Sequence, residues 1–240
     1  LKISVITVTK NSEKFLGENL ESLKSQTYKN FEHIIIDGKS TDGTLEVIKK
    51  YSENIHHWKS ENDLGLYDAM NKGIKLATGD IIGILNSDDV YYPDALSIVN
   101  EYFCSNPNVD FLFGSVHKHK LMHGFNPKKI KWTFGFYTTH SIGFFIRKSS
   151  QLKLGLYDTQ YKYSADYDLF YRMIVKENFK GISTKKNEIL GKFRKGGLSS
   201  RIRYIDFLRE NNRIRINNGQ NKFIVYIIFL LRLTRNFKRL

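Results

Sequence analysis

Two adjacent carboxylates follow one of the apolar runs of this 240-residue chain. The predicted strand 81–86 leads into Asn86-Ser87-Asp88-Asp89. Adjacent carboxylates repel each other unless a cation or several hydrogen-bond donors balance them, and Mg²⁺ and Mn²⁺ prefer oxygen ligands. Asp88 and Asp89 therefore predict a site for a divalent metal that substrate phosphates complete. The alternative is that one of them caps the helix that begins near Tyr92-Pro93.

A third carboxylate, Asp37, stands at the end of the β-branched run 32–37. A hydrogen-bond acceptor at this place can bind a nucleobase imide or a ribose hydroxyl. The segment 37–44 is also rich in Gly, Ser and Asp, so by itself it could be a simple turn, with Asp42 as the N-cap of the next helix.

The elements that must position these residues alternate along the first half of the chain. Short β-branched runs alternate with apolar residues at three- and four-residue spacing, which is typical of a parallel sheet with crossover helices. The predicted strands are 3–9, 32–37, 55–60, 81–86 and 109–113, and the predicted helices are 13–26, 44–51, 67–77 and 94–103. Ligands of such sheets collect at the carboxyl ends of the strands, where the acidic segments lie. The fold class is therefore α/β with a mostly parallel central sheet.

The second half is less regular. A strand is expected at 141–146 and a helix at 167–176, and the segment from residue 201 onward is expected to form two helices that break near Asn217-Asn218-Gly219.

Four motifs, in their order along the chain, resemble family 2 glycosyltransferases with the GT-A fold, which is Rossmann-like. They are Val5-Ile6-Thr7-Val8-Thr9-Lys10-Asn11, the segment Ile36 to Thr44, the segment Ser60 to Gly73, and Leu85-Asn86-Ser87-Asp88-Asp89. The resemblance covers about residues 1–200 and is firmest over 1–112. Asn86 stands where relatives often have Asp, which shifts metal binding to the two carboxylates after it.

The resemblance implies a nucleotide-sugar site across the strand ends. Thr9 and Asp37 would lie near the base and ribose, and Asp68 and Asn71 would line the same pocket. The pair Asp88-Asp89 would hold Mn²⁺ or Mg²⁺ against the diphosphate, where the ion neutralises the charge that develops on the leaving group. UDP is the expected nucleotide.

The resemblance also implies a catalytic base. The segment Ser164 to Met173 is similar to the acidic motif with which the family opens a helix, and it makes Asp166 the group that deprotonates the acceptor hydroxyl. A base opposite the leaving diphosphate permits a single in-line displacement, which inverts the anomeric centre. Asp168 is expected to cap the helix or to pair with Arg172. The alternative for Asp166 is also a helix cap.

Two further sites are implied in the same way. His140 matches a position where relatives often carry His, and it would contact the metal, the diphosphate or the acceptor; the alternative is a buried structural histidine. The segment Phe193 to Ser199 resembles a loop that closes over the donor, so Arg194 and Lys195 could reach the diphosphate. The alternative is a surface loop.

The positive charge of the chain is concentrated at its C-terminal end. Residues 180–240 hold 16 Lys and Arg but three Asp and Glu, a net charge of +13, whereas residues 1–179 carry +1. The apolar run 223–231 is too short to cross a bilayer, but flanking cations would let it lie on an anionic membrane. The single cysteine, Cys104, excludes an internal disulfide, and no secretory signal is apparent. A cytoplasmic protein, peripheral on the cytoplasmic face of the membrane, is the expectation.

These observations predict a GT-A catalytic domain at 1–200, divided into a nucleotide-sugar half (1–112) and an acceptor half (113–200), and a basic amphipathic helical tail at 201–240. The predicted activity is the metal-dependent transfer of a sugar from a nucleotide-sugar, with a UDP-sugar as the expected donor, to a hydroxyl of a glycan or lipid-linked acceptor. The alternative is a phosphate-binding module for nucleic acid or anionic surfaces on an α/β scaffold. Acidic loops would repel a polyanion from the pocket, so nucleic acid is not expected as a partner.

Overall fold

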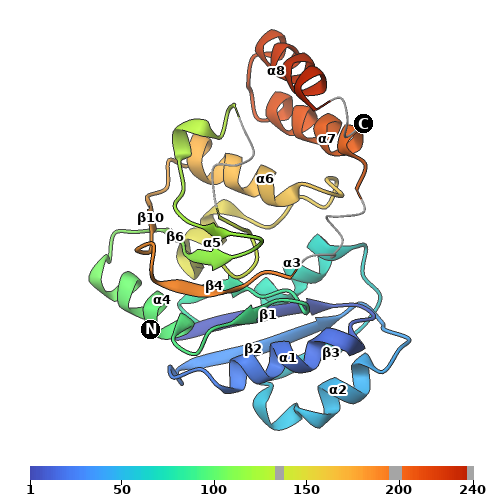
Figure 1. Cartoon of the computed structure of the whole chain (residues 1–240), viewed down its shortest axis with the longest axis vertical. Helices are drawn as coiled ribbons and strands as arrows, with labels where there is room; N and C mark the ends of the chain where they lie inside the picture. The colour runs from blue at the N-terminus through green and yellow to red at the C-terminus, as the bar shows by residue number, and fades with distance from the viewer. Residues whose placement is uncertain (133–137, 195–201, 237–240) are drawn as a thin grey trace.

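The central β-sheet has seven strands in the order β10-β6-β9-β4-β1-β2-β3 (Figure 1). The computed structural model describes residues 1–132, 138–194 and 202–236. The strands are β1 (Ile3–Thr9), β2 (Phe31–Asp37), β3 (His57–Ser60), β4 (Ile81–Ile84), β6 (Phe111–Phe113), β9 (Phe144–Arg147) and β10 (Gly181–Ser183). β1 is parallel to β2 and β4, and β2 is parallel to β3. The predicted fold class, α/β with a mostly parallel sheet, is confirmed.

One strand of the sheet runs against its neighbours. β9 lies between β4 and β6 and is antiparallel to both. The strand predicted at 141–146 begins only at Phe144, because Ile142 has a φ of 67°, in the left-handed region that strands do not use.

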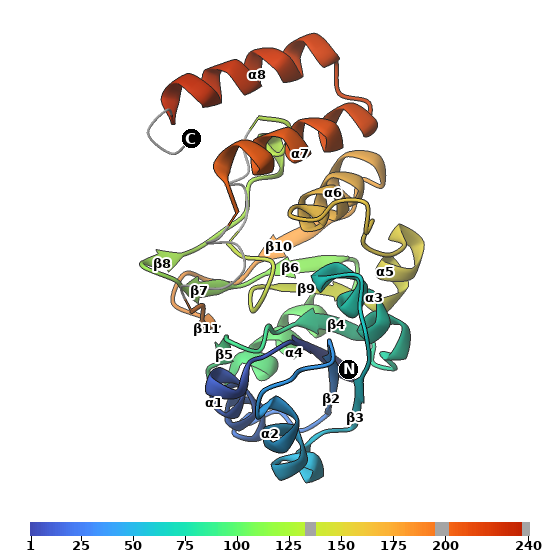
Figure 2. The same cartoon turned by 90° about the vertical axis from the view of Figure 1, so that its right-hand side faces the viewer.

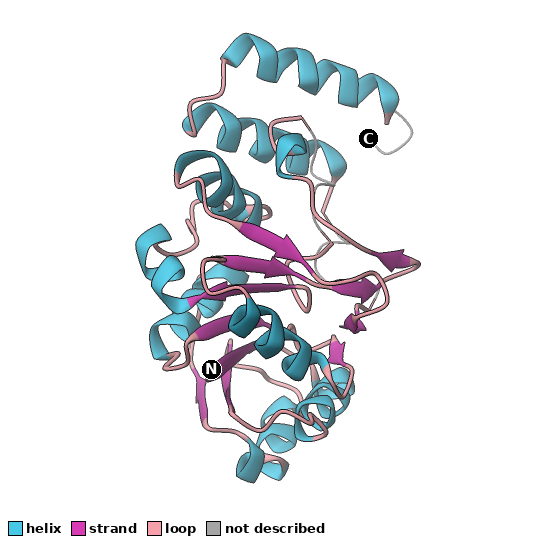
Figure 3. Cartoon of the chain, turned by 90° about the vertical axis from the view of Figure 1, so that its left-hand side faces the viewer, coloured by secondary structure: helices cyan, strands magenta, loops and turns pink. Residues whose placement is uncertain are grey.

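Helices cover both faces of the sheet (Figure 3). Successive residues of a strand point to opposite faces, so Ile6 and Val5 of β1 belong to two different cores. The face of Ile6 packs against α3 (Leu66–Leu76) and α6 (Ala165–Tyr171), and the face of Val5 packs against α1 (Glu13–Lys24), α2 (Thr44–Lys50) and α4 (Ala95–Ser105).

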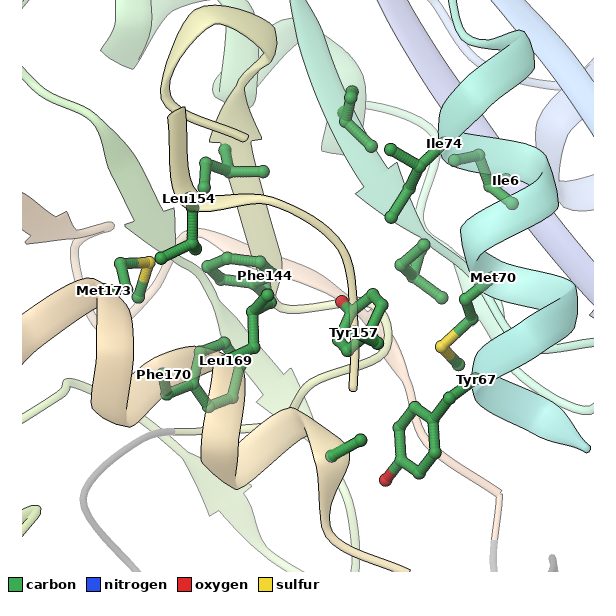
Figure 4. Close-up of a cluster of buried hydrophobic side chains, with 14 of the residues drawn as sticks. Ile6, Tyr67, Met70, Ile74, Phe144, Leu154, Tyr157, Leu169, Phe170 and Met173 are labelled. Atoms are coloured by element: carbon green, nitrogen blue, oxygen red, sulfur yellow. The ribbon is translucent and has the colours of Figure 1, made fainter. Parts of the chain in front are cut away.

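The core between α3 and α6 reaches the edge of the candidate site. Figure 4 shows Tyr67 and Met70 of α3 on one side of this core and Leu169 and Phe170 of α6 on the other. Helix α3 lies very close to the sheet, because a Cβ atom added at Gly73 would collide with the Ile6 side chain. The absence of a side chain at Gly73 therefore allows the second half of α3 to pack closely against the middle of β1.

A second, smaller sheet was not predicted. It has the order β5-β11-β7-β8 and consists of β5 (Val90–Tyr91), β11 (Ile189–Lys192), β7 (Ser115–His117) and β8 (Leu121–Met122). Strands of two to four residues are too short for an alternating pattern to stand out. The helix α5 (Lys148–Leu154) was also not predicted, and the helix predicted at 167–176 is α6 followed by the π-helical turn Arg172–Lys176.

The chain ends in two helices, as predicted. α7 (Tyr204–Asn217) packs on α6, and α8 (Lys222–Arg235) packs across α7 at the outer end of the molecule (Figure 2). Asn221 caps α8 by accepting from the backbone N–H of Phe223 at 2.9 Å. Within the described part of the chain, no helix is both long and apolar enough to span a bilayer. The domain boundary predicted at residue 200 falls in 195–201, outside the described residues.

Candidate active site

A cleft of about 2570 Å³ opens at the carboxyl ends of β1 and β4 and extends to α7 and α8. Five of the predicted site residues line it, from five different segments. They are Thr9, Asp68, Asp88, His140 and Asp166. Four others that the structure describes do not line it, namely Asp37, Asn71, Asp89 and Arg194. Lys195 lies outside the described residues.

The part of the cleft that is predicted to bind the nucleotide begins where β1 ends. The Oγ1 atom of Thr9 is buried there without a hydrogen-bond partner among the described residues. Asp37, at the end of the neighbouring β2, is fully buried, and its carboxylate accepts from the Oγ atoms of Ser40 (2.5 Å) and Ser60 (2.6 Å). Asp37 thus braces its own turn, and its contact with a nucleotide remains a prediction.

The two predicted donor residues of α3 differ in orientation. Asp68 lines the cleft and accepts from the Leu64 backbone N–H (3.1 Å) and from Lys72 Nζ (3.2 Å). Burial opposes ionisation of Asp68, but these two donors outweigh it and lower its pKa. The Asn71 amide instead bonds both the backbone N–H and the C=O of Tyr157, each at 2.9 Å, in the core. Contrary to the prediction, Asn71 lies outside the pocket lining, because its side chain points into the core and not along the helix edge.

The structure separates the roles of the two adjacent carboxylates. Asp89 is fully buried and accepts from Ser141 Oγ at 2.7 Å and from the Arg194 backbone N–H at 3.0 Å. Burial, followed by the nearby Asp88 charge, raises the pKa of Asp89 to about 7. Asp88 faces the cleft, and burial raises its pKa as well. Asp89 therefore holds Ser141 and the Arg194 backbone together in this structure, and its predicted role as a metal ligand stays a prediction.

The side-chain oxygen atoms of Asp88 and of the neighbouring Asn86 suit a hard divalent cation. Asn86 Oδ1 is buried without a partner among the described residues, and Asn86 lines the cleft beside Asp88. Mg²⁺ and Mn²⁺ are held in this way by one or two protein oxygens and by substrate phosphates. No cluster of three His, Cys, Asp or Glu side chains occurs among the described residues, so a cage made by the protein alone is absent there.

Asp166, the predicted base, lies in the first turn of α6 and lines the cleft. Its Oδ1 accepts from the Tyr167 backbone N–H at 2.9 Å and lies 3.1 Å from the Tyr67 hydroxyl. His140 Nε2 lies 2.7 Å from the Tyr157 hydroxyl. Burial lowers the pKa of His140 and outweighs the opposing effect of Asp166, so the imidazole is neutral near pH 7.

Four contacts complete the account of the predicted residues. The Arg194 side chain lies over the Phe15 ring, 4.6 Å from its centroid, and forms an ion pair with Glu18. Its Nε also donates to the Asp88 backbone carbonyl at 3.2 Å, so Arg194 lies beside two cleft-lining residues, Phe15 and Asp88, without lining the cleft itself, and its contact with a diphosphate stays a prediction. The predicted pair of Asp168 and Arg172 is confirmed, with Nε and Oδ2 2.8 Å apart.

Two cleft-lining residues were missed. Tyr67 lies in a motif that the sequence singled out, immediately before Asp68, but its contact with Asp166 spans 99 residues of sequence. Lys118 lines the cleft, and its Nζ lies 4.3 Å from the centroid of the Phe193 ring. Burial lowers the pKa of Lys118. No local sequence signal marks Lys118 as part of a site, and the motif that contains Tyr67 gives no sign of its contact with Asp166.

The fold and the cleft together define an α/β protein of the GT-A type, with acidic side chains gathered at the carboxyl edge of its sheet. The family model described as glycosyl transferase family 2 matches residues 4–179. The chain belongs to this family.

Individual relatives extend this comparison. The chain is 32% identical over 190 residues to an uncharacterized glycosyltransferase of Methanocaldococcus jannaschii, covering 73% of this chain and 65% of that protein. It is 29% identical over 222 residues to a PGL/p-HBAD biosynthesis glycosyltransferase of Mycobacterium tuberculosis, covering 86% and 82%. The chain thus spans slightly less than two thirds of the archaeal relative.

Solved structures share the fold. S. aureus TarS 1–349 in complex with UDP-GlcNAc has a TM-score of 0.70 at 20% identity and covers 99% of this chain and 73% of that one. The mannosyltransferase PcManGT from Pyrobaculum calidifontis, in complex with GDP-Man and Mn²⁺, has a TM-score of 0.67 at 18% identity and covers 95% and 67%.

Proposed function

We propose that this glycosyltransferase moves a sugar from a nucleoside diphosphate sugar to a hydroxyl of a glycan or lipid-linked acceptor, with inversion at the anomeric carbon. The observation that carries the proposal is that Asp88 and Asp166, from segments far apart in sequence, line one cleft. The names of the mycobacterial relative and of TarS, which was solved with UDP-GlcNAc, favour a UDP-sugar and a role in bacterial surface glycan assembly.

On the donor side, Asp88 and Asn86 would hold Mn²⁺ or Mg²⁺. When bound, such an ion would stabilise the negative charge of the departing nucleoside diphosphate. Thr9 and Asp68 line the same end of the cleft and would contact the nucleoside, and Asp37 would contact it from beneath.

On the acceptor side, Asp166 would act as the general base. Its carboxylate takes the proton of the acceptor hydroxyl as that oxygen forms a bond to the anomeric carbon. The bond from the anomeric carbon to the diphosphate oxygen breaks, and the nucleoside diphosphate leaves with the electron pair. Neutral His140, near this end of the cleft, can hydrogen-bond the acceptor without adding a charge.

Calorimetric titration of UDP, with and without Mn²⁺, tests the donor site. Asp88→Asn should abolish the Mn²⁺-dependent part of the binding, because it removes the charged ligand from the cleft. The matched control is Asp94→Asn, an exposed position that precedes α4, where Asn also suits a helix start. Unchanged Mn²⁺-dependent binding by Asp88→Asn would contradict the metal assignment. If UDP, GDP and dTDP all fail to bind the wild-type protein, the proposal as a whole fails.

We also propose that α8 attaches the enzyme to the cytoplasmic face of an anionic membrane. Val225 and Ile228 are buried against the rest of the molecule, whereas the opposite side of α8 is apolar and exposed. Its exposed residues are Phe223 (75%), Ile224 (38%), Tyr226 (57%), Ile227 (43%), Leu230 (61%) and Leu231 (64%). Lys222 and Arg235 stand at the two ends of this exposed stripe, where they can meet lipid phosphates.

Sedimentation with vesicles containing phosphatidylglycerol tests the stripe. Phe223→Ser together with Leu230→Ser should weaken vesicle binding at least about tenfold, because each large apolar side chain contributes about 1.5–3 kcal/mol when it leaves water. Leu152→Ser is the matched control, since Leu152 is 71% exposed on α5. Equal binding by the double variant and the control would contradict attachment through α8.

A further inference from the structure

One carboxylate of helix α7, that of Glu210, contacts the segment immediately before Asp166, the proposed base. Glu210 Oε1 accepts from the backbone N–H groups of Tyr163 and Ser164, each at 2.7 Å, and Oε2 accepts from that of Lys162 at 2.8 Å. Hydrogen bonds to a charged acceptor are stronger than those between neutral groups. Three consecutive peptide N–H groups are thus fixed by a single side chain from a distant part of the sequence.

The Tyr163 residue is held on its other side as well. Its carbonyl oxygen lies 3.2 Å from the Tyr67 hydroxyl, which lies 3.1 Å from Asp166 Oδ1. Figure 4 shows the Tyr67 ring extending from α3 beside this core. The contacts therefore run from Glu210 through the Tyr163 backbone and the Tyr67 hydroxyl to the base.

The start of α6 depends on these external contacts. The N-cap residue Ser164 makes no capping hydrogen bond through its own side chain. Its Oγ accepts instead from Asn211 Nδ2 of α7, at 3.3 Å. One turn further along, Asn218 Nδ2 donates to Asp168 Oδ1 at 2.8 Å. Contacts from α7 and its C-terminal end therefore bracket the short segment that carries Asp166.

We propose that Glu210 is a positioning residue for the Asp166 carboxylate. The proposal rests on the proposed function, in which Asp166 is the base. Gln at position 210 would have the same shape but a single acceptor oxygen, and its NH₂ group would face a backbone N–H. Residues 162–164 would then shift, and a displacement of a catalytic group by about 1 Å can cost about a hundredfold in rate.

The test compares Glu210→Gln with Glu177→Gln in the full chain. Glu177 follows the π-helical turn at the other end of the same helical segment and forms an exposed ion pair with Lys153 at 2.9 Å. Turnover is measured without acceptor, as hydrolysis of whichever of UDP-GlcNAc, UDP-glucose or GDP-mannose the wild-type protein uses. Titration of the matching nucleoside diphosphate gives donor-site affinity, and amide hydrogen exchange at 162–164 reports the local hydrogen bonds.

The expected result for Glu210→Gln is a turnover number lowered about ten- to hundredfold, a nucleotide affinity within about twofold of wild type, and faster exchange at 162–164. Glu177→Gln should match the wild type in all three. Glu210→Asp keeps the charge and should fall between wild type and Glu210→Gln, and it serves as the test if Glu210→Gln does not fold.

Either of two results would overturn the proposal, and so would a third that is described below. One is normal turnover despite faster exchange, and the other is unchanged exchange at 162–164. A joint loss of turnover, nucleotide affinity and melting temperature in both Glu210 variants would likewise overturn it in favour of a general role in folding. Failure of the proposed function is distinguishable, because Asp166→Asn would then keep wild-type turnover, or the wild-type protein would hydrolyse none of the donors.

Discussion

Glu32 joins β1, β2 and the turn before β4 through one buried carboxylate. It is 6% exposed and accepts from Lys2 Nζ (2.7 Å), Ser4 Oγ (2.5 Å), and the backbone N–H and Oγ1 of Thr78 (both 2.6 Å). β1 ends at Thr9, β2 ends at Asp37, and β4 leads into the segment that contains Asp88. Loss of the Glu32 charge should therefore weaken the part of the fold that supports the donor site.

The size of the effect follows from the pKa of Glu32. Burial alone would raise this pKa, but the hydrogen bonds from Lys2, Ser4 and Thr78 outweigh burial and lower it from 4.5 to about 2. A carboxyl group whose pKa is lower in the folded state stabilises that state at pH values above its unfolded-state pKa. This stabilisation is lost as the pH falls through its folded-state pKa. The carboxylate thus contributes about 3 kcal/mol at pH 7 and about 1 kcal/mol at pH 3.

Urea unfolding of the wild type and of Glu32→Gln at pH 7 and pH 3 measures this contribution. Glu32→Gln should lower the free energy of unfolding by about 3 kcal/mol at pH 7, and the difference should shrink to about 1 kcal/mol at pH 3. Glu46→Gln, at an exposed position in the first turn of α2, should change little at either pH. A difference below about 0.5 kcal/mol at pH 7, or one that is equal at the two pH values, would refute the reasoning.

Three further outcomes are expected. Asp166→Asn should lower turnover at least about a hundredfold in a donor-hydrolysis assay, while UDP affinity by calorimetry stays within about twofold; equal turnover would exclude it as the base. Asn71→Ala should lower the free energy of urea unfolding by about 2–4 kcal/mol, because it leaves the buried N–H and C=O of Tyr157 unpaired, and a loss below about 1 kcal/mol would contradict this account. Gly73→Ala should cost about 1–3 kcal/mol in the same assay through its collision with Ile6, and an unchanged midpoint would show that α3 can move away from β1.

The sequence predicts the parallel half of the sheet well, because its strands are long enough for their pattern to be visible. The predicted strand 3–9 is β1 as observed, and the helix predicted at 67–77 is α3 within one residue at each end. The short strands of the second sheet, two to four residues each, become visible only through their pairing partners. For example, Gly191 of β11 pairs with Tyr91 of β5, 100 positions earlier in the chain.

The sequence locates residues that line the cleft where they follow strand ends or open helices, as Thr9, Asp68, Asp88 and Asp166 do. Prediction failed where the direction of a side chain depends on a distant partner. The amide of Asn71 turns inward because the Tyr157 backbone needs both a donor and an acceptor, and the Arg194 side chain is held by Phe15 and Glu18 of α1 and by the Asp88 carbonyl. Neither partner can be inferred from spacing along the chain.

The pair Asp88-Asp89 shows that two adjacent carboxylates of one motif can have different surroundings. Asp88 and Asp89 lie in the turn between β4 and β5, where one carboxylate faces the cleft and the other is buried in the protein. Asp89 accepts from Ser141, before β9, and from the backbone of Arg194, after β11, and so holds two distant segments at the end of β4. This leaves Asp88 directed into the cleft. The proposed relation of Glu210 to Asp166 is similar. Glu210 holds the backbone of residues 162–164, immediately before the carboxylate that would take the acceptor proton.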